Sequence, residues 1–476
     1  MNGYKKLFNN VIIFTIGSLG SKLIAFLLLP LYSFYLTSTE YGTVDLVITT
    51  VSMLLPIVSV CMNDAAVRFA MDKINDNRKV LTNCFVVFFT TFLIFILFSP
   101  VFSISKLIFN YIIYLYLLIF LQGSYQIIAQ FARGIGKSKV FAGSGIILAF
   151  STAIFAIIFL VVFKTRLIGY FWAMIIAYVI SLSYLLVFVR PFDYFSFRLV
   201  DWKFSKDLIR YSFPLIPNYL IWIGTNSISK YIITFFISVS ATGIFAIGSK
   251  IPTMLSVISD IFIQAWQLSV IEEFESEDEE NSDFYNNIFS IYSMILIVGA
   301  GAFIMLLKMI FRYLFDASYF QAWEVVPFLF VGTVFSAFAG FIGQVYIGLK
   351  KTSGIIRTSS IAGIVSIVLS FVLIPTIGLS GAGISSMVSF LILFLIRYKE
   401  MHEEMNLNIK WGSFIASLLV LGCEILVLNI GFTMLIEFII NFSLLLLLLF
   451  IYREPLILIL KMILSKVKVI QKDDLM

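Results

Sequence analysis

The sequence predicts an all-α, polytopic membrane protein with about 14 transmembrane helices. Of its 476 residues, 61% are hydrophobic and only 13% are charged. A typical soluble domain has about a quarter of its residues charged, so most of this surface must face lipid. The net charge of +6 does not call for nucleic acid, because the basic clusters adjoin apolar runs, where membrane orientation explains them.

The apolar runs set the number of spans. A hydrocarbon core about 30 Å thick needs roughly 20 apolar residues per helix. On that measure we place spans at residues 11–36, 41–70, 80–103, 107–133, 140–163, 167–189, 211–237, 241–270, 284–306, 320–348, 354–375, 378–398, 411–431 and 434–452. Polar stretches after residues 189 and 398 divide them into groups of six, six and two.

The basic residues predict the orientation. If the N-terminus is cytoplasmic, most of the 33 lysines and arginines fall in inner loops. The outer loops then hold Lys106, Lys164, Arg166, Lys308 and Arg312. This bias places both termini inside, because cytoplasmic loops of membrane proteins are enriched in Lys and Arg. Acidic residues contribute little to that bias, so the acidic run at 272–283 does not contradict it. The run at 11–36 is too long for a cleavable signal, so we expect it to remain as a span.

An internal repeat relates the two groups of six. Three stretches recur in the same order about 200 residues later: Tyr35–Gly42 as Phe236–Gly243, Gln130–Ser138 as Gln344–Thr352, and Ile168–Tyr170 as Ile377–Leu379. Because each repeat has an even number of helices, the halves share one orientation, related by a two-fold axis along the membrane normal. We predict lobes at 1–200 and 201–405, and two extra helices with a basic cytoplasmic tail at 406–476.

Two stretches carry a family resemblance. Leu27–Tyr32 followed by Tyr35–Gly42 resembles the first hairpin of Wzx-type polysaccharide flippases. The turn Arg133–Ser138 and the arrangement of helices are also similar to that family, within the superfamily of multidrug, oligosaccharidyl-lipid and polysaccharide exporters. The resemblance implies two six-helix lobes around a cavity that opens alternately to each side. It also implies an undecaprenyl-diphosphate-linked oligosaccharide as substrate.

Lysines inside the spans are the first candidate site residues. Lys22 lies about 16 Å into its helix, near the bilayer midplane. A central charge is costly in lipid, so Lys22 is expected to face a polar cavity, where it would attract a diphosphate. The alternative is a lysine paired with a neighbouring carboxylate for packing. Lys250 has a similar depth, whereas Lys230 is close enough to the outer end to snorkel, and Arg68 could join them.

The carboxylates have competing interpretations. Asp45, Asp64 and Asp260 are candidate counter-ions or sites of ion coupling, although Asp45 is close enough to the outer interface to be solvated. Asp64 and Arg68 have the i, i+4 spacing of an intrahelical ion pair, which competes with a role in gating. Two further carboxylates lie in the last two helices, outside the repeat, where local packing explains them better than substrate binding: Glu424 and Glu437.

Glutamines form a stripe on one predicted helix. Gln122, Gln126 and Gln130 recur every four residues, and Gln130 aligns with Gln344 in the repeat. Primary amides both donate and accept hydrogen bonds, so the stripe could bind sugar hydroxyls. Hydrogen bonding between helices is the equal alternative.

The sequence contains no set of residues that predicts catalysis. The stretch Gly136–Ser138 lacks the glycine and the preceding strand of a phosphate-binding loop. With one histidine and no metal-ligand spacing, we expect neither an enzyme nor a bound metal or cofactor. A membrane-embedded polysaccharide polymerase would need a larger external loop than the longest one predicted here, at 307–319.

The leading hypothesis is a flippase of the bacterial cytoplasmic membrane for surface polysaccharide, such as O-antigen or capsule. Its partners would be the lipid-linked oligosaccharide, membrane lipid and a polymerase or other assembly proteins. Directionality would come from an ion gradient or from consumption of the product outside. The alternatives are a multidrug exporter, which the intramembrane lysines disfavour, and a peptidoglycan-precursor exporter.

Overall fold

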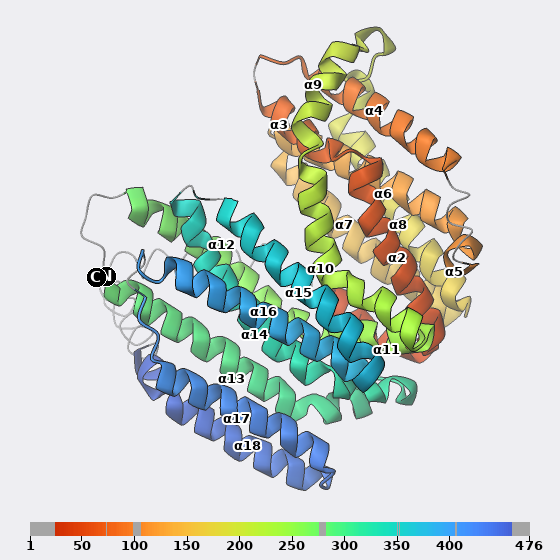
Figure 1. Cartoon of the computed structure of the whole chain (residues 1–476). Coiled ribbons are helices and arrows are strands. Elements are labelled where there is room, and N and C mark those ends of the chain that lie inside the picture. The colour runs from red at the N-terminus through yellow and green to blue at the C-terminus, as the bar shows by residue number, and fades with distance from the viewer. Residues whose placement is uncertain are drawn as a thin grey trace, which may run out of the picture. The chain divides into compact units, whose positions relative to one another are not determined.

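The computed structural model describes residues 24–72, 74–98, 106–275, 282–349, 351, 353–404 and 407–458. Within these residues the regular secondary structure is entirely helical (Figure 1). Eleven helices of the described part are long and apolar enough to cross a membrane, or twelve if α11 and the start of α12 form one span bent by 42°. The other two predicted spans correspond to the shorter helix Ile24–Tyr35 and to the more polar α10. The all-α polytopic fold is therefore confirmed.

The chain divides into two compact units by packing. One comprises residues 19–246, and the other contains residues 247–476. The lobe boundary predicted near residue 200 follows the sequence repeat, a different criterion, and it stays a prediction. By packing, the helices between 202 and 246 belong with the first unit.

The first unit consists of helices arranged around α6. Its labelled elements are α2 (Ser38–Val58), α3 (Met62–Met71), α4 (Asn77–Leu97), α5 (Lys106–Asn110), α6 (Ile112–Gly134), α7 (Ser138–Ile157), η2 (Ile158–Val162), α8 (Arg166–Val189), η3 (Pro191–Asp193), η4 (Phe197–Leu199), α9 (Trp202–Ser212), α10 (Leu215–Phe236) and most of α11 (Val239–Lys250). α6 packs against α2, α3, α4, α7 and α8. Aromatic side chains such as Phe88, Phe131 and Phe171 are fully buried in the core of this unit.

The polar stretch after α8 contains a helix that the sequence does not predict. α9 begins at Trp202, with Asp201 as its N-cap: the Asp201 carboxylate accepts hydrogen bonds from the backbone N–H groups of Lys203 and Phe204. Lys79 of α4 forms an ion pair with the same carboxylate at 2.7 Å. The hydrogen bond from Lys79 and those from the backbone lower the pKa of Asp201. These contacts hold the start of α9 to the start of α4.

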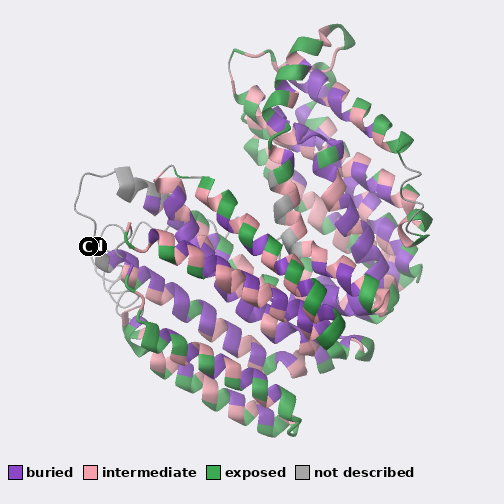
Figure 2. Ribbon diagram, in the orientation of Figure 1, coloured by how far each residue is buried: buried purple, intermediate pink, exposed green. Residues whose placement is uncertain are grey.

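The second unit is built around α14. Its elements are the end of α11, α12 (Thr253–Glu275), α13 (Ser282–Leu314), η5 (Ala317–Glu324), α14 (Val326–Gly348), α15 (Ser353–Ile377), α16 (Leu379–Met401), α17 (Trp411–Ile430) and α18 (Met434–Ile451). In the most apolar 18-residue stretch of each helix, 72% of α14 is buried but only 17% of α18. Figure 2 shows the many exposed residues along α17 and α18. α14 is therefore the core helix of this unit, and α18 lies at its periphery.

Two predicted boundaries change. α13 continues to Leu314, eight residues beyond the predicted end of its span at 306. The 3-10 helix η5 then begins at Ala317, capped by Asp316. Much of the outer loop predicted at 307–319 is therefore helical, because the apolar pattern of α13 extends past the length that a bilayer requires.

Candidate functional site

Two glycines bring the repeated connectors together in the first unit. Gly42 lies in α2 and Gly243 in α11, at matching positions of the sequence repeat. A Cβ atom at Gly42 would overlap the carbonyl oxygen of Val239, and one at Gly243 would overlap that of Ser38. Val239 and Ser38 are themselves equivalent in the repeat. The contact is reciprocal, as a two-fold relation between repeats requires, and only glycine permits so close an approach.

The start of α2 is fixed by its own sequence. Thr37 and Glu40 form a capping box, in which the Thr37 hydroxyl accepts from the Glu40 N–H and the Glu40 carboxylate accepts from the Thr37 N–H. Ser38 in the first turn then shares a 2.6 Å hydrogen bond with Ser240 in the first turn of α11. The capping box thus positions α2 for the contact with the second connector.

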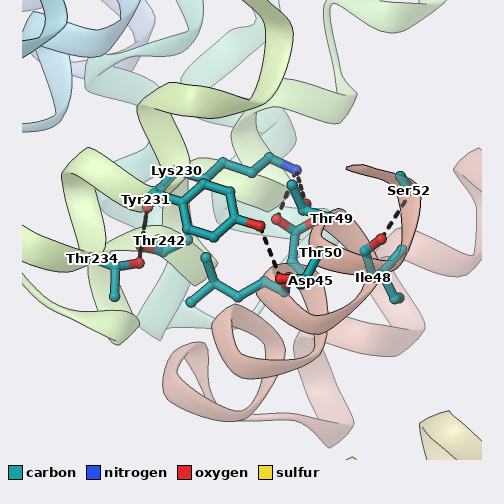
Figure 3. Close-up of polar contacts among 10 residues, drawn as sticks. Asp45, Ile48, Thr49, Thr50, Ser52, Lys230, Tyr231, Thr234 and Thr242 are labelled. Carbon is teal, nitrogen blue, oxygen red and sulfur yellow. Dashed lines mark hydrogen bonds and ion pairs between the residues drawn. The ribbon is translucent and has the colours of Figure 1, made fainter. Parts of the chain in front are cut away.

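About two turns beyond Ser38 in α2, an ion pair links α2 to α10 (Figure 3). The Lys230 ammonium lies 2.7 Å from a carboxylate oxygen of Asp45 and donates a hydrogen bond to the Thr49 hydroxyl at 3.3 Å. The exposed fractions of the two charged side chains are 12% and 10%. In this structure the ammonium of Lys230 is therefore paired with Asp45, and neither charge is left uncompensated in an apolar environment.

A hydroxyl pair extends the same interface. Thr50 of α2 and Tyr231 of α10 share a hydrogen bond of 2.9 Å, next to the ion pair in Figure 3. The Thr50 hydroxyl also donates to the carbonyl of Leu46 within its own helix. We call the contacts at Gly42–Gly243, Ser38–Ser240, Asp45–Lys230 and Thr50–Tyr231 the α2 seam. The seam joins the first repeat to the start of the second through polar and backbone contacts.

The predicted span at 41–70 is broken in the structure. Pro56, which lacks an N–H, stands near the end of α2, and the chain leaves the helix after Val58. Val60 and Cys61 both have φ of 50°, a left-handed conformation that is costly for a β-branched valine. The Thr91 hydroxyl of α4 caps the freed carbonyl of Val58 at 2.6 Å. The span is therefore two helices, α2 and α3.

A cavity of about 180 Å³ lies at this break. Polar groups line it from three elements: Ser59 and Asn63 at the break, Gln122 and Gln126 of α6, and Tyr219 of α10. Neither glutamine amide hydrogen-bonds to any residue that the structure describes. We call this space the amide cavity. It presents two primary amides whose donors and acceptors are open to a ligand or to water.

Asp64 lies beside the amide cavity, and its partner differs from the one expected. Its carboxylate accepts hydrogen bonds from the Tyr219 hydroxyl at 3.2 and 3.3 Å and from the Asn63 amide at 3.1 Å. No ion pair between Asp64 and Arg68 occurs in the described structure, and Arg68 is exposed. The predicted pair is therefore wrong. An exposed arginine gains little from such a pair, whereas Tyr219 reaches the carboxylate from α10.

The other candidate residues are dispersed. Gln130 and Gln344, equivalent in the repeat, each bury a side-chain oxygen without a hydrogen-bond partner among the described residues. Lys250 ends α11 and Asp260 lies in α12, and both side chains are exposed in the second unit. Lys22 lies outside the described residues. The predicted roles of these residues in a substrate cavity or in ion coupling stay predictions.

Three contributing residues were missed by sequence reasoning. Tyr219, Tyr231 and Asn63 make contacts in the seam or the cavity, yet each is an ordinary polar residue within a helix. The sequence signal for them is the number of polar residues in α10. That helix carries several hydroxyl and amide residues around Lys230, more than a lipid-facing helix needs.

Comparison with solved structures identifies the fold. The fold is similar to the lipid II flippase MurJ in an inward closed conformation, with a TM-score of 0.70 and 14% identity over 93% of this chain and 99% of that one. It is also similar to an inward-facing multidrug resistance MATE family transporter of the MOP superfamily, with a TM-score of 0.61 and 15% identity over 83% and 94%. A MOP superfamily transporter from Pyrococcus furiosus matches with a TM-score of 0.56 and 14% identity over 84% and 96%. The chain thus has many helices able to span a membrane and shares its fold with these transporters.

The sequence places it more narrowly. The chain belongs to the polysaccharide biosynthesis protein family, whose model matches residues 7–267. That segment contains the hairpin whose residues resemble Wzx-type flippases, the α2 seam and the amide cavity, so the resemblance is confirmed. No curated protein sequence matches the chain significantly.

Proposed function

We propose that the protein is a flippase that moves an undecaprenyl-diphosphate-linked oligosaccharide across the bacterial cytoplasmic membrane, with both termini inside. Family membership in polysaccharide biosynthesis and the fold shared with a lipid II flippase support this class of activity. The amide cavity is the observation that carries the assignment to a sugar-bearing substrate. Surface polysaccharides such as O-antigen or capsule are the products that such a flippase would serve.

The chemistry of the amide cavity suits a sugar. Gln122 and Gln126 each offer a donor and an acceptor, as a ring hydroxyl does, and neither carries charge. Ser59 and Tyr219 add hydroxyl groups. Ligand pockets commonly measure about 300–1,000 Å³, so a cavity of about 180 Å³ would hold one sugar unit of a larger substrate.

The diphosphate would be bound by cations elsewhere on the path. Lys22, Lys250 and Arg68 remain candidates for that role. Lys230 is a weaker one in this state, because Asp45 neutralises it at 2.7 Å. The polyprenyl tail would stay in lipid, where burial of its apolar surface costs nothing. A polymerase or other assembly proteins would consume the substrate on the outer side.

Replacing both amide-cavity glutamines tests the sugar assignment. Gln122→Ala and Gln126→Ala would each remove hydrogen bonds to the sugar worth about 1 kcal/mol. Each should therefore lower surface polysaccharide about fivefold at equal protein level. Lipid-linked oligosaccharide should accumulate inside. The exposed Gln321→Ala is the matched control and should match wild type. Wild-type polysaccharide from the double variant would overturn the assignment.

A separate pair of variants tests the cationic path. Lys22→Ala with Lys250→Ala should reduce polysaccharide output by weakening attraction to the diphosphate. Unchanged output from this double variant would remove these lysines from the path while leaving the sugar assignment standing.

The alternative cargo that shares this chemistry is a peptidoglycan precursor, also a sugar on a lipid diphosphate. Rescue of cells depleted of their own lipid II flippase would favour that cargo. Failure to rescue, with restored surface polysaccharide in a flippase-deficient strain, would favour the oligosaccharide. A multidrug exporter would instead confer drug resistance, without either rescue.

A further inference from the structure

A carboxyl group is buried without a partner in the second unit, away from the site described above. Glu424 lies in α17, which packs against α13 and α18. Its exposed fraction is 0%, and neither carboxyl oxygen has a hydrogen-bond partner in the described residues. Buried carboxyl groups almost always have such partners, so this arrangement requires an explanation.

The surrounding helices accommodate the carboxyl group closely. Gly301 of α13 faces it: a Cβ atom there would lie 3.1 Å from one carboxyl oxygen and 3.2 Å from the other. Asn441 of α18 is also 0% exposed, and its amide lacks a partner in the described residues. By helical rise, Glu424 lies about 9 Å from the outer end of α17 and Asn441 about 10 Å from that of α18. The two side chains therefore have the same depth.

The partly buried cation of α13 is already paired with another carboxylate. Lys308 of α13 bonds to Glu437 of α18 at 2.6 Å and donates to the carbonyl of Leu428, one turn beyond Glu424 in α17. Arg312 lies one turn further out on α13. At its inner end, α17 meets the apolar rings of α14 and α16, through Phe414. No cation in the described structure compensates Glu424.

An ionised carboxylate in such a place would cost several kcal/mol, which a bound proton removes. We propose that Glu424 is a proton-binding site, through which a proton gradient acts on the transport cycle. The ligand is a single proton, taken up and released by one carboxyl group in helices outside the two-fold repeat. This inference rests on the proposed flippase function for its coupling role, but the bound proton can be tested without transport.

Buried polar groups mark a route to this site. The Glu437–Lys308 pair lies between Glu424 and the outer helix ends, with side-chain exposures of 5% and 16%. On the inner side, Ser417 of α17 and Tyr452, just after α18, share a buried hydrogen bond of 3.1 Å. Ionisable side chains inside membrane proteins commonly mark proton paths, and carboxyl groups are among those that relay protons. Glu424 lies between the two pairs.

Labelling with dicyclohexylcarbodiimide tests the bound proton in the full-length protein in membranes. A protonated carboxyl oxygen adds to the central carbon of the carbodiimide while its proton moves to nitrogen, and acyl transfer gives a stable N-acylurea. Mass spectrometry should find the adduct on Glu424 but not on Glu437, which forms an ion pair with Lys308 at 2.6 Å. The adduct should disappear in Glu424→Gln, and Gly301→Ala should reduce it by crowding the carboxyl group. No adduct on Glu424, or equal labelling of Glu437, would overturn the proposal.

Transport in proteoliposomes tests the coupling. Wild-type protein should move lipid-linked oligosaccharide faster under a pH gradient, whereas Glu424→Gln should keep its gradient-independent rate and lose the stimulation. Asn441→Leu, which removes the buried amide at the same depth in α18, should weaken the stimulation. Full stimulation in Glu424→Gln would overturn the coupling role. Absence of transport by either protein, with Glu424 labelled, would instead count against the proposed flippase function.

Discussion

Two buried carboxyl groups, Asp45 and Glu424, occupy contrasting environments. Asp45 faces a lysine at 2.7 Å and joins α2 to α10, helices that belong to different sequence repeats. Glu424 has no partner in the described structure and lies among α13, α17 and α18. Gly301 lies beside the Glu424 carboxyl, whereas Gly42 faces the backbone of α11.

The presence or absence of a partner distinguishes a structural contact, at Asp45, from the proposed proton-binding site at Glu424. A carboxylate with its own ammonium is satisfied, and its contribution is to hold two helices together in this state. A carboxyl group without a partner must be neutral to stay buried, so its charge can change with proton supply. The Asp45–Lys230 pair therefore stabilises one conformation. The charge of Glu424 instead depends on the supply of protons.

The largest expected effect comes from removing the lysine of the seam. Lys230→Met leaves Asp45 buried without its cation, which should cost about 3–5 kcal/mol of stability. A lower melting temperature of the purified protein in detergent would report it. Adding Asp45→Leu should recover much of the loss, because the uncompensated charge is then gone. A single variant as stable as wild type would show that the pair contributes nothing.

A smaller effect is expected at the glycine of the seam. Gly42→Ala places a methyl group against the backbone of α11, where overpacking should cost about 1–3 kcal/mol. Gly145 of α7 is a matched control, since nothing lies within 4 Å of a Cβ atom there. Gly145→Ala should leave the melting temperature unchanged or raise it slightly, because alanine favours a helix. Equal destabilisation by both variants would contradict the close contact.

The smallest effect is expected at Glu424. Glu424→Gln replaces a neutral acid with a neutral amide of the same shape, so stability should change by less than about 1 kcal/mol. Thermal unfolding of the variant beside Lys230→Met gives the comparison directly. A loss as large as that of Lys230→Met would mean that Glu424 is ionised and paired.

The sequence predicted the helices better than their contacts. Runs of apolar residues located the eleven or twelve helices of the described part that are long and apolar enough to cross a membrane, because the bilayer imposes a length on each helix. The echo of Tyr35–Gly42 predicted a repeat, and the structure brings Gly42 against Gly243. Asp45 and Lys230 are 185 residues apart in the sequence, and no local sequence pattern predicts that they pair. The two partners could be found only once α2 and α10 lay side by side.

Local rules failed where tertiary contacts compete with them. Asp64 and Arg68 have ideal helical spacing, yet the Asp64 carboxylate bonds to Tyr219, 155 residues away. The break after Val58 depends on two left-handed residues that no glycine marks. The sequence favoured local packing over substrate binding for Glu424, because a sequence cannot show that a carboxyl group lacks partners.

Transport by the purified protein is the most direct test of the central claim. Lipid-linked oligosaccharide placed in one leaflet of proteoliposomes should become accessible to a glycosidase on the opposite side. The account predicts wild-type transport, at least fivefold slower transport by the protein with Gln122→Ala and Gln126→Ala, and no change with Gln321→Ala. Equal rates for wild type, the double variant and empty liposomes would contradict it.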